Sequence, residues 1–179
     1  MKEKKPAKPL APIKKPVITI PTLESFPVVV EKYGVSLGMK AGTNAGAFCF
    51  GGDVDYSVAN IVKDTSVRLS LDYLSGKNPV DNDDYSIYNI KMGITYSFGI
   101  LKSSGIPVDW YAGAGILLPI KVKKNRIGKW GAEIYGGGKY ILSESRKIYV
   151  EIGYSGIKYA DSSPAIKGVL STIGYSYSF

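Results

Sequence analysis

The stretch AIKGVLSTIGYSYSF, at residues 165–179, decides the fold. From Ile173 onward every second residue is large and apolar or aromatic, and small residues lie between them. Strict alternation at period 2 predicts a β-strand with two different faces. Three aromatic side chains on one face are unusual at the end of a soluble domain, unless another sheet covers them.

The same alternation recurs in seven segments upstream, separated by turn-forming residues. These segments are about 33–42, 47–58, 65–74, 85–98, 108–120, 129–141 and 147–159. The composition agrees with an all-β chain, because the 179 residues include 21 Gly and 14 Tyr and contain few helix-forming stretches. We therefore predict one domain at 33–179, a closed eight-stranded antiparallel up-and-down β-barrel.

Residues 1–32 are rich in Lys and Pro and form a different kind of segment. Proline fixes the backbone and removes hydrogen-bond donors, and the lysines repel one another, so we expect an extended tail. The tail is interpreted either as a flexible linker or as a tether for an envelope polymer or a protein partner. It contains no apolar run that would form an intact secretory signal, so the chain is expected to be intracellular or to have lost its signal before Met1.

Two kinds of barrel fit eight alternating strands, and the polar face distinguishes them. A soluble barrel that binds a lipophilic ligand would bury its apolar face, whereas a transmembrane barrel exposes that face to lipid. The polar face here is mostly Gly and Ser, which suits a narrow interior better than a solvated surface. We predict that its few charges form a network in the lumen, made of Lys40, Asp53, Asp55, Arg68, Asp72, Lys91, Glu133, Lys139 and Glu151.

The aromatic residues of the apolar face fall at two levels when the strands alternate in direction. One end of the barrel receives Tyr33, Tyr56, Tyr96, Phe98, Trp110, Tyr140, Tyr177 and Phe179. The other end receives Phe48, Tyr73, Tyr88, Trp130 and Tyr154. Amphipathic rings that flank an aliphatic band are typical of the two interfaces of a membrane. The pattern therefore favours a transmembrane barrel.

The segment 33–179 resembles the small eight-stranded outer-membrane barrels of Gram-negative bacteria, the OmpA-like and OmpX-like group. The most specific part of the resemblance is the ending with Tyr175, Tyr177 and Phe179, which is similar to the signal read by the barrel-insertion machinery. The resemblance implies a location in the bacterial outer membrane, periplasmic termini, and contact with outer-membrane lipid and lipopolysaccharide. It also allows a periplasmic protein or peptidoglycan partner for residues 1–32. The expected outer loops, at 43–46, 75–84, 121–128 and 161–164, are shorter than many in the group.

The interior charges support two functional hypotheses. Charges in a narrow lumen are costly unless they are paired, so we expect contacts between Asp55 and Arg68, between Asp72 and Lys91, and between Lys139 and Glu151. Such pairs can be purely structural, in a barrel that anchors or scaffolds a partner. Alternatively, they can form the constriction of a narrow ion or small-solute channel. The inward tyrosines Tyr111, Tyr135 and Tyr149 favour a plugged lumen.

The sequence gives little support for catalysis or for binding of a metal or cofactor. The sequence has no His and only one Cys, so it lacks the residues needed for a Ser-His-Asp triad, a Cys-His pair or a common zinc site. We expect no catalytic residues, no metal site and no cofactor. Nucleic acid is not an expected partner, because basic residues cluster only in the tail and at 121–129.

Overall fold

The computed structural model describes residues 34–77, 84–100, 106–122, 129–157 and 166–179. The Lys/Pro-rich tail and Tyr33 lie outside the described residues, so the expectations about them stay predictions. Among the residues described, no helix is both long and apolar enough to cross a membrane.

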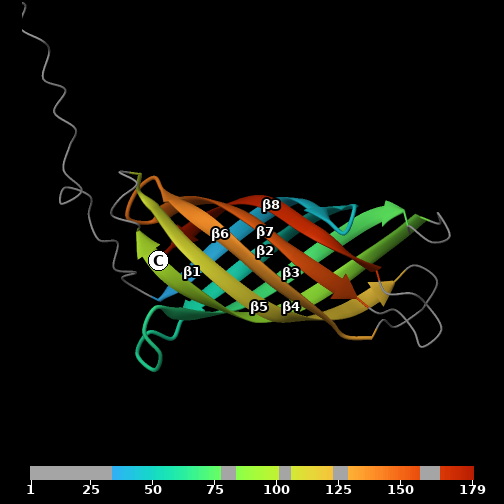
Figure 1. The fold of residues 1–179 in the computed structure, drawn as a ribbon, viewed down its shortest axis with the longest axis horizontal. Coiled ribbons are helices and arrows are strands. Elements are labelled where there is room, and N and C mark those ends of the chain that lie inside the picture. Colours follow the sequence, from blue (N-terminus) through green and yellow to red (C-terminus); the bar gives the residue numbers. More distant parts are fainter. Residues whose placement is uncertain (1–33, 78–83, 101–105, 123–128, 158–165) are drawn as a thin grey trace, which may run out of the picture.

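Eight strands form a single closed antiparallel barrel in the order β1-β2-β3-β4-β5-β6-β7-β8 (Figure 1). Each strand pairs with its neighbours in sequence, and β1 also pairs with β8. The strands are β1 (Val35–Asn44), β2 (Ala47–Ser57), β3 (Thr65–Lys77), β4 (Asp84–Ile100), β5 (Val108–Val122), β6 (Gly131–Ile141), β7 (Arg146–Ile157) and β8 (Ile166–Ser178). The prediction of a closed eight-stranded up-and-down barrel is confirmed.

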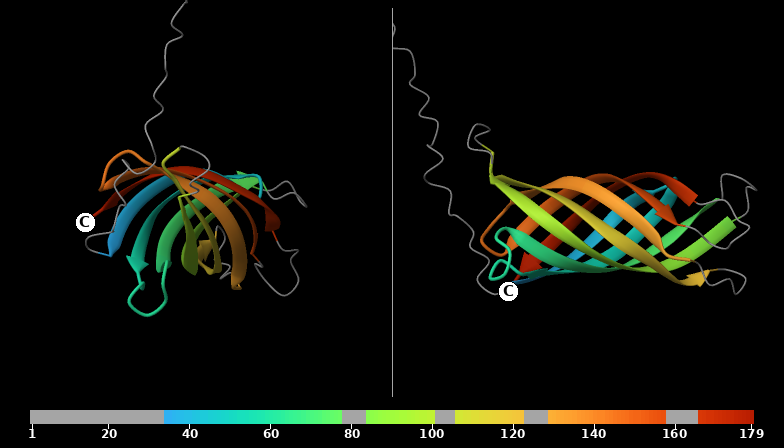
Figure 2. Two further views of the ribbon diagram at one scale, coloured as in Figure 1. Left: turned by 60° about the vertical axis from the view of Figure 1, so that its left-hand side comes forward. Right: turned by 60° about the horizontal axis from the view of Figure 1, so that its bottom comes forward.

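The two ends of the barrel differ in their connections. Phe179 lies at one end, which we call the carboxyl-terminal end, together with the β2–β3 and β6–β7 connections (Figure 2). The opposite end, which we call the hairpin end, carries the β1–β2 turn. This turn has only two residues, Ala45 and Gly46, with φ of 51° and 83°. Two successive positive φ angles are typical of the tight turn whose twist matches a β-hairpin, and Gly adopts such angles without a steric penalty.

Strands β3 and β4 extend further toward the hairpin end than the sequence predicts. The predicted loop at 75–84 is partly wrong, because pairing continues through Ser75 with Ser86 to Lys77 with Asp84. The apolar alternation of the outer face stops at Tyr73 and Tyr88, so the outer positions of the last rungs carry no hydrophobic signal. Backbone hydrogen bonding maintains the ladder where the sequence pattern ends.

The aliphatic rows face outward. Leu37, Leu69, Ile94, Ile134 and Ile152 are between 46% and 64% exposed on five different strands. A soluble barrel with these side chains at its centre, the second alternative considered from the sequence, is therefore wrong. The exterior is apolar and the interior contains the polar face.

Inward glycines make room for inward tyrosines. A Cβ atom at Gly113 would lie 2.7 Å from the hydroxyl of Tyr135, and one at Gly137 would lie 2.9 Å from the hydroxyl of Tyr111. These positions accept no side chain while the rings keep their places. The repeated Gly of the polar face therefore allows bulky rings to fill a narrow barrel.

Candidate functional site

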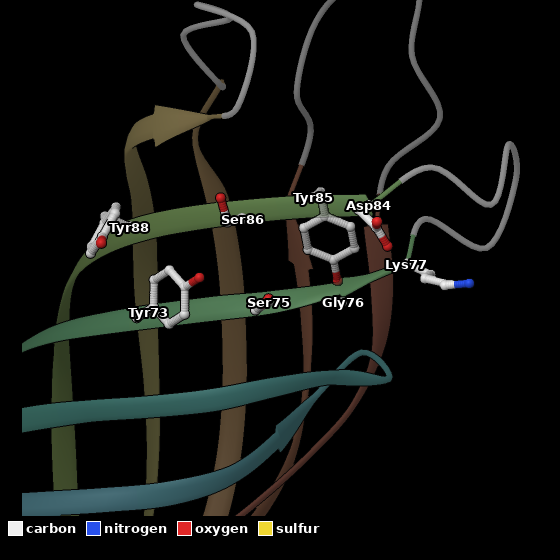
Figure 3. Close-up of a pocket in the computed structure, with 8 residues that line it drawn as sticks. All are labelled: Tyr73, Ser75, Gly76, Lys77, Asp84, Tyr85, Ser86 and Tyr88. Atoms are coloured by element: carbon white, nitrogen blue, oxygen red, sulfur yellow. The ribbon is translucent and has the colours of Figure 1, made fainter.

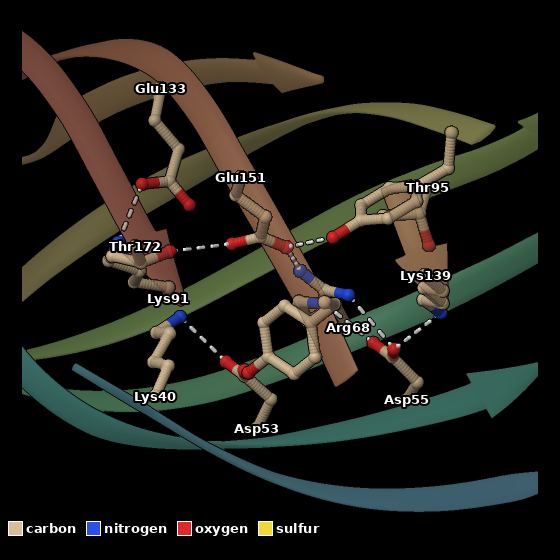
Figure 4. A network of polar contacts seen from close by, with 12 residues as sticks. Lys40, Asp53, Asp55, Arg68, Lys91, Thr95, Glu133, Lys139, Glu151 and Thr172 are labelled. Atoms are coloured by element: carbon tan, nitrogen blue, oxygen red, sulfur yellow. Dashed lines mark hydrogen bonds and ion pairs between the residues drawn. The ribbon is translucent and has the colours of Figure 1, made fainter. Parts of the chain in front are cut away.

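The polar core of the barrel interior is a network of nine charged side chains, which we call the charged layer. It contains four cations and five carboxylates, and none of these side chains is more than 11% exposed. The strands bring together residues that are far apart in sequence, and Figure 4 shows the members other than Asp72 converging from several sides of the lumen. The members are the nine residues expected from the sequence, Lys40, Asp53, Asp55, Arg68, Asp72, Lys91, Glu133, Lys139 and Glu151.

Arg68 is the centre of this layer. Its Nε and Nη2 donate to the two oxygens of Asp55 at 2.6 and 3.0 Å, while Nη1 donates to Glu151. The two-point contact with Asp55 suits the planar fork of a guanidinium, which binds carboxylates more specifically than an ammonium does. Lys139 also contacts Asp55, at 3.3 Å. A single carboxylate therefore joins two cations.

A second branch of the charged layer lies around Asp72, which is fully buried. Lys91 contacts Asp72 at 2.8 Å and Glu133 at 2.6 Å, and Lys40 contacts Asp72 at 3.4 Å and Asp53 at 2.7 Å. Each ammonium therefore bridges two carboxylates on different strands. Because every member has an oppositely charged neighbour, the desolvation cost of the charges is offset by their attraction.

The structure differs from the sequence prediction in one pair. Asp55 with Arg68 and Asp72 with Lys91 lie in contact, as their strand positions suggest. Glu151, however, is directed toward Arg68, and Lys139 contacts Asp55 in place of the expected partner. In the register of β6 and β7, Lys139 lies opposite Tyr149, so its ammonium turns across the lumen. Contacts across a barrel cannot be read from adjacent strands alone.

Three inward tyrosines complete the charged layer. Tyr111 donates to Glu151 at 2.8 Å and Tyr149 donates to Asp53 at 2.5 Å. The guanidinium carbon of Arg68 lies 5.5 to 5.9 Å from the ring centroids of Tyr111, Tyr135 and Tyr149. A cation at this distance from an aromatic face is attracted by the ring quadrupole. The rings thus fill space and also interact with the buried cation.

Toward the hairpin end the interior becomes apolar, a feature that the sequence reasoning missed. A cluster of buried side chains from six strands, which we call the apolar layer, fills the lumen there. Its members are Ala47, Cys49, Leu74, Tyr85, Ile87, Leu117, Ile157 and Ile166. Extending the inner alternation from Asp72 to Leu74 and from Asn89 to Ile87 could have found two of them.

The β1–β2 turn closes over this apolar layer. Ala45 packs against the cluster, and its backbone N–H donates to the carbonyl of Val169 at 2.9 Å. A Cβ atom at Gly168 would lie 2.9 Å from the Cα of Ala45, so the turn sits directly on β8. The tip of the first hairpin therefore belongs to the packed interior.

The charged layer leaves no space for solvent around Arg68. The gap lined by Gly38, Asp53, Arg68, Tyr149 and their neighbours has no room for a water-sized molecule. The charged groups of this layer are buried and pair with one another, although the Oδ1 atom of Asp72 accepts no hydrogen bond and has only the ion contact with Lys40. In the described part of the chain, no group of three or more His, Cys, Asp or Glu side chains is arranged to hold a metal ion.

The predicted interface aromatics that the structure describes lie on the outer wall. Their described members are Phe48, Tyr56, Tyr73, Tyr88, Tyr96, Trp110, Trp130, Tyr140, Tyr154 and Tyr177. Tyr73 and Tyr88 pack together with ring centroids 5.0 Å apart, and Tyr177 packs edge-on against Phe179 at the same distance. Tyr175, Tyr177 and Phe179, expected to form the insertion signal, are 40% to 49% exposed.

Comparison with known proteins relates the chain to others through its fold. No protein-family model matches it, and no curated protein sequence matches it significantly. The crystal structure of the N-terminal β-barrel domain of Pseudomonas aeruginosa OprF is similar with a TM-score of 0.52 and 18% identity, over 81% of this chain and 96% of that one. The crystal structure of Neisserial surface protein A (NspA) is similar with a TM-score of 0.60 and 14% identity, over 81% of this chain and 94% of that one.

At these identities the likeness concerns the fold. Both neighbours are small eight-stranded outer-membrane barrels, and this chain has the same closed architecture. The fold thus defines a small barrel of the outer-membrane type. Inside this barrel the charged layer is followed, toward the hairpin end, by the apolar layer.

Proposed function

We propose that the protein is a closed outer-membrane barrel with a structural role in the bacterial envelope, anchoring the segment 1–32 at the membrane. The observation that carries the proposal is the combination of an apolar outer wall with a filled interior. An exposed aliphatic belt is stable only against lipid, because water would leave a large apolar surface unburied. The tight packing around Arg68, which leaves no room for a water-sized molecule, favours a structural role of the barrel and its tail over transport.

Reconstitution in a planar lipid bilayer tests this role. We expect the barrel to insert and to give no steady single-channel current, because the charged and apolar layers both block the lumen. Insertion is checked independently by a shift in gel migration on heating, which compact membrane barrels show when they unfold. Steady currents that change in Arg68→Ala or Lys91→Ala would instead support the narrow channel considered from the sequence.

Anchoring through the tail is tested with the full chain in lipid nanodiscs and purified peptidoglycan. The lysines of the tail favour an anionic polymer, since multiple positive charges raise local association with it. We expect sedimentation with peptidoglycan that weakens in the variant Lys4→Gln/Lys5→Gln/Lys8→Gln. The matched control is Lys63→Gln, on the exposed β2–β3 connection. Equal sedimentation of all three proteins would contradict tethering by the tail lysines.

A further inference from the structure

The β3–β4 hairpin carries an open recess at the hairpin end that the closed-barrel role does not use (Figure 3). Its volume is about 640 Å³, within the range of sites that bind small molecules. We call it the hairpin recess. Its lining includes three outward cross-strand pairs, Tyr73 with Tyr88, Ser75 with Ser86, and Lys77 with Asp84, and the pair of Gly76 with Tyr85 between the last two.

The three pairs form a ladder of increasing polarity. The outer row of β3 runs from Leu69 and Leu71 to Tyr73, and then becomes polar. The outer row of β4 changes in the same way beyond Tyr88. If the proposed membrane location holds, on which this inference rests, the recess lies where acyl chains give way to lipid headgroups.

We infer that the hairpin recess binds the sugar ring of a glycolipid headgroup. A sugar ring has apolar C–H faces and a rim of hydroxyl groups, and the recess offers both complements. Tyr73 and Tyr88 present tilted ring faces at 49° to each other, while Ser75 and Ser86 provide hydroxyls that both donate and accept hydrogen bonds. Lys77 adds donors and Asp84 adds acceptors at the rim.

Charge and polarity disfavour the other lipid groups. Asp84 lies opposite Lys77 in the strand register, so the rim carries one carboxylate and one ammonium and has no net charge that would select a bare phosphate. An acyl chain would desolvate the two serine hydroxyls without providing hydrogen bonds, which is costly. A neutral sugar ring can stack on the two tyrosines and can form hydrogen bonds with the two serines and with Lys77 and Asp84.

The test uses the full chain in phosphatidylcholine nanodiscs that contain monoglucosyl diacylglycerol as the probe. Saturation of tyrosine ring protons should transfer magnetisation to the glucose ring protons. In Ser75→Leu/Ser86→Leu, the mole fraction of glycolipid that gives half-maximal transfer should rise about tenfold, because the hydrogen-bonding rung is lost. Phosphatidylglycerol replaces the glycolipid in a parallel sample and should show weak transfer to its headgroup.

The matched control is Thr43→Leu/Ser171→Leu. Thr43 and Ser171 are likewise directly paired hydroxyl residues, on β1 and β8, and both are exposed. Thr43 pairs with Phe48, and Phe48 pairs with Ser75, so the control pair lies at the same level of the barrel as the serines. Two residues further toward the middle of the strands, the control has Ala41 and Ile173 on the outer face, where the recess has two tyrosines. The control should leave transfer unchanged. If both double variants respond alike, or if phosphatidylglycerol responds as the glycolipid does, the sugar site is overturned.

Failure of this inference is separable from failure of the proposed function. If the wild-type protein inserts into nanodiscs but gives no transfer to glucose, only the proposed sugar binding at the hairpin recess is wrong. If the protein does not insert, both the sugar binding and the proposed membrane role are wrong. If Ser75→Leu/Ser86→Leu does not fold, Tyr88→Leu provides a second variant. It removes one stacking face on an exposed side chain and should weaken transfer in the same direction.

Discussion

The charged layer and the apolar layer fill the same lumen by different physics. The charged layer depends on directional contacts, such as the fork of Arg68 on Asp55, and each charge needs a partner. The apolar layer depends on close packing of side chains such as Leu117 and Ile87, neither of which is exposed at all. The difference predicts that the charged layer fails when one partner is lost, whereas the apolar layer weakens in proportion to the volume removed.

The largest effect is expected for Arg68→Ala. The substitution leaves Asp55 and Glu151 without their shared cation, and breaking a buried ion pair costs about 3–5 kcal/mol. The free energy of unfolding, measured by urea titration in lipid vesicles with Trp fluorescence, should fall by this amount. Arg68→Lys keeps the charge but not the fork, so it should lose less. Equal losses in both variants would show that a positive charge without the fork does not stabilise the layer, and no loss in Arg68→Lys would show that the fork adds nothing to the charge.

The apolar layer is tested with Leu117→Ala. Loss of a fully buried leucine removes packing contacts and leaves a cavity, at a cost of about 2–5 kcal/mol in the free energy of unfolding. Leu118 is the next residue on the same strand and is 45% exposed on the outer wall, so Leu118→Ala is the control. Lipid tails replace its contacts, so the control should change stability little. Similar losses would argue that the apolar layer is loosely packed.

Overfilling the lumen is tested with Gly174→Ala. The added Cβ would overlap the Tyr149 ring and lie 2.6 Å from the carbonyl oxygen of Met39, so strand or ring must shift. Overpacking of this kind costs about 1–3 kcal/mol. Gly52→Ala is the control, because its nearest neighbour is a carbonyl oxygen at 3.4 Å. Urea titrations of the two variants in the same vesicles should separate them, and coincident curves would contradict a tightly filled interior.

The smallest effect is expected for Tyr149→Phe, which removes one hydroxyl and keeps the ring. Asp53 loses a hydrogen bond of 2.5 Å but retains Lys40, so the cost should be about 1–2 kcal/mol. Tyr175→Phe changes an outward ring on the facing strand and should have almost no effect. Unfolding free energies for the two variants give the comparison directly. An equal response would mean that the hydroxyl of Tyr149 does not support the charged layer.

Much of the fold could be predicted because alternation at period 2 assigns each residue to one of two faces. That reasoning placed Arg68 and Leu69 on opposite faces, and the Gly and Ser of the polar face then indicated that Arg68 points inward. It failed where both faces are apolar, as at Tyr73 and Leu74, because lipid outside and packing inside select the same residue types. It also failed where the hairpin ladder continues through polar pairs such as Ser75 with Ser86.

The sequence by itself determined the strands, their alternating faces and the closed barrel, because these depend on local periodicity and on neighbours in the chain. Only the tertiary structure decided the ion pairs that cross the lumen, in which Lys139 contacts Asp55 and Arg68 contacts Glu151. It alone decided that one end is sealed by apolar side chains under the β1–β2 turn. Contacts across a closed barrel depend on strand stagger and side-chain reach, which no local pattern encodes.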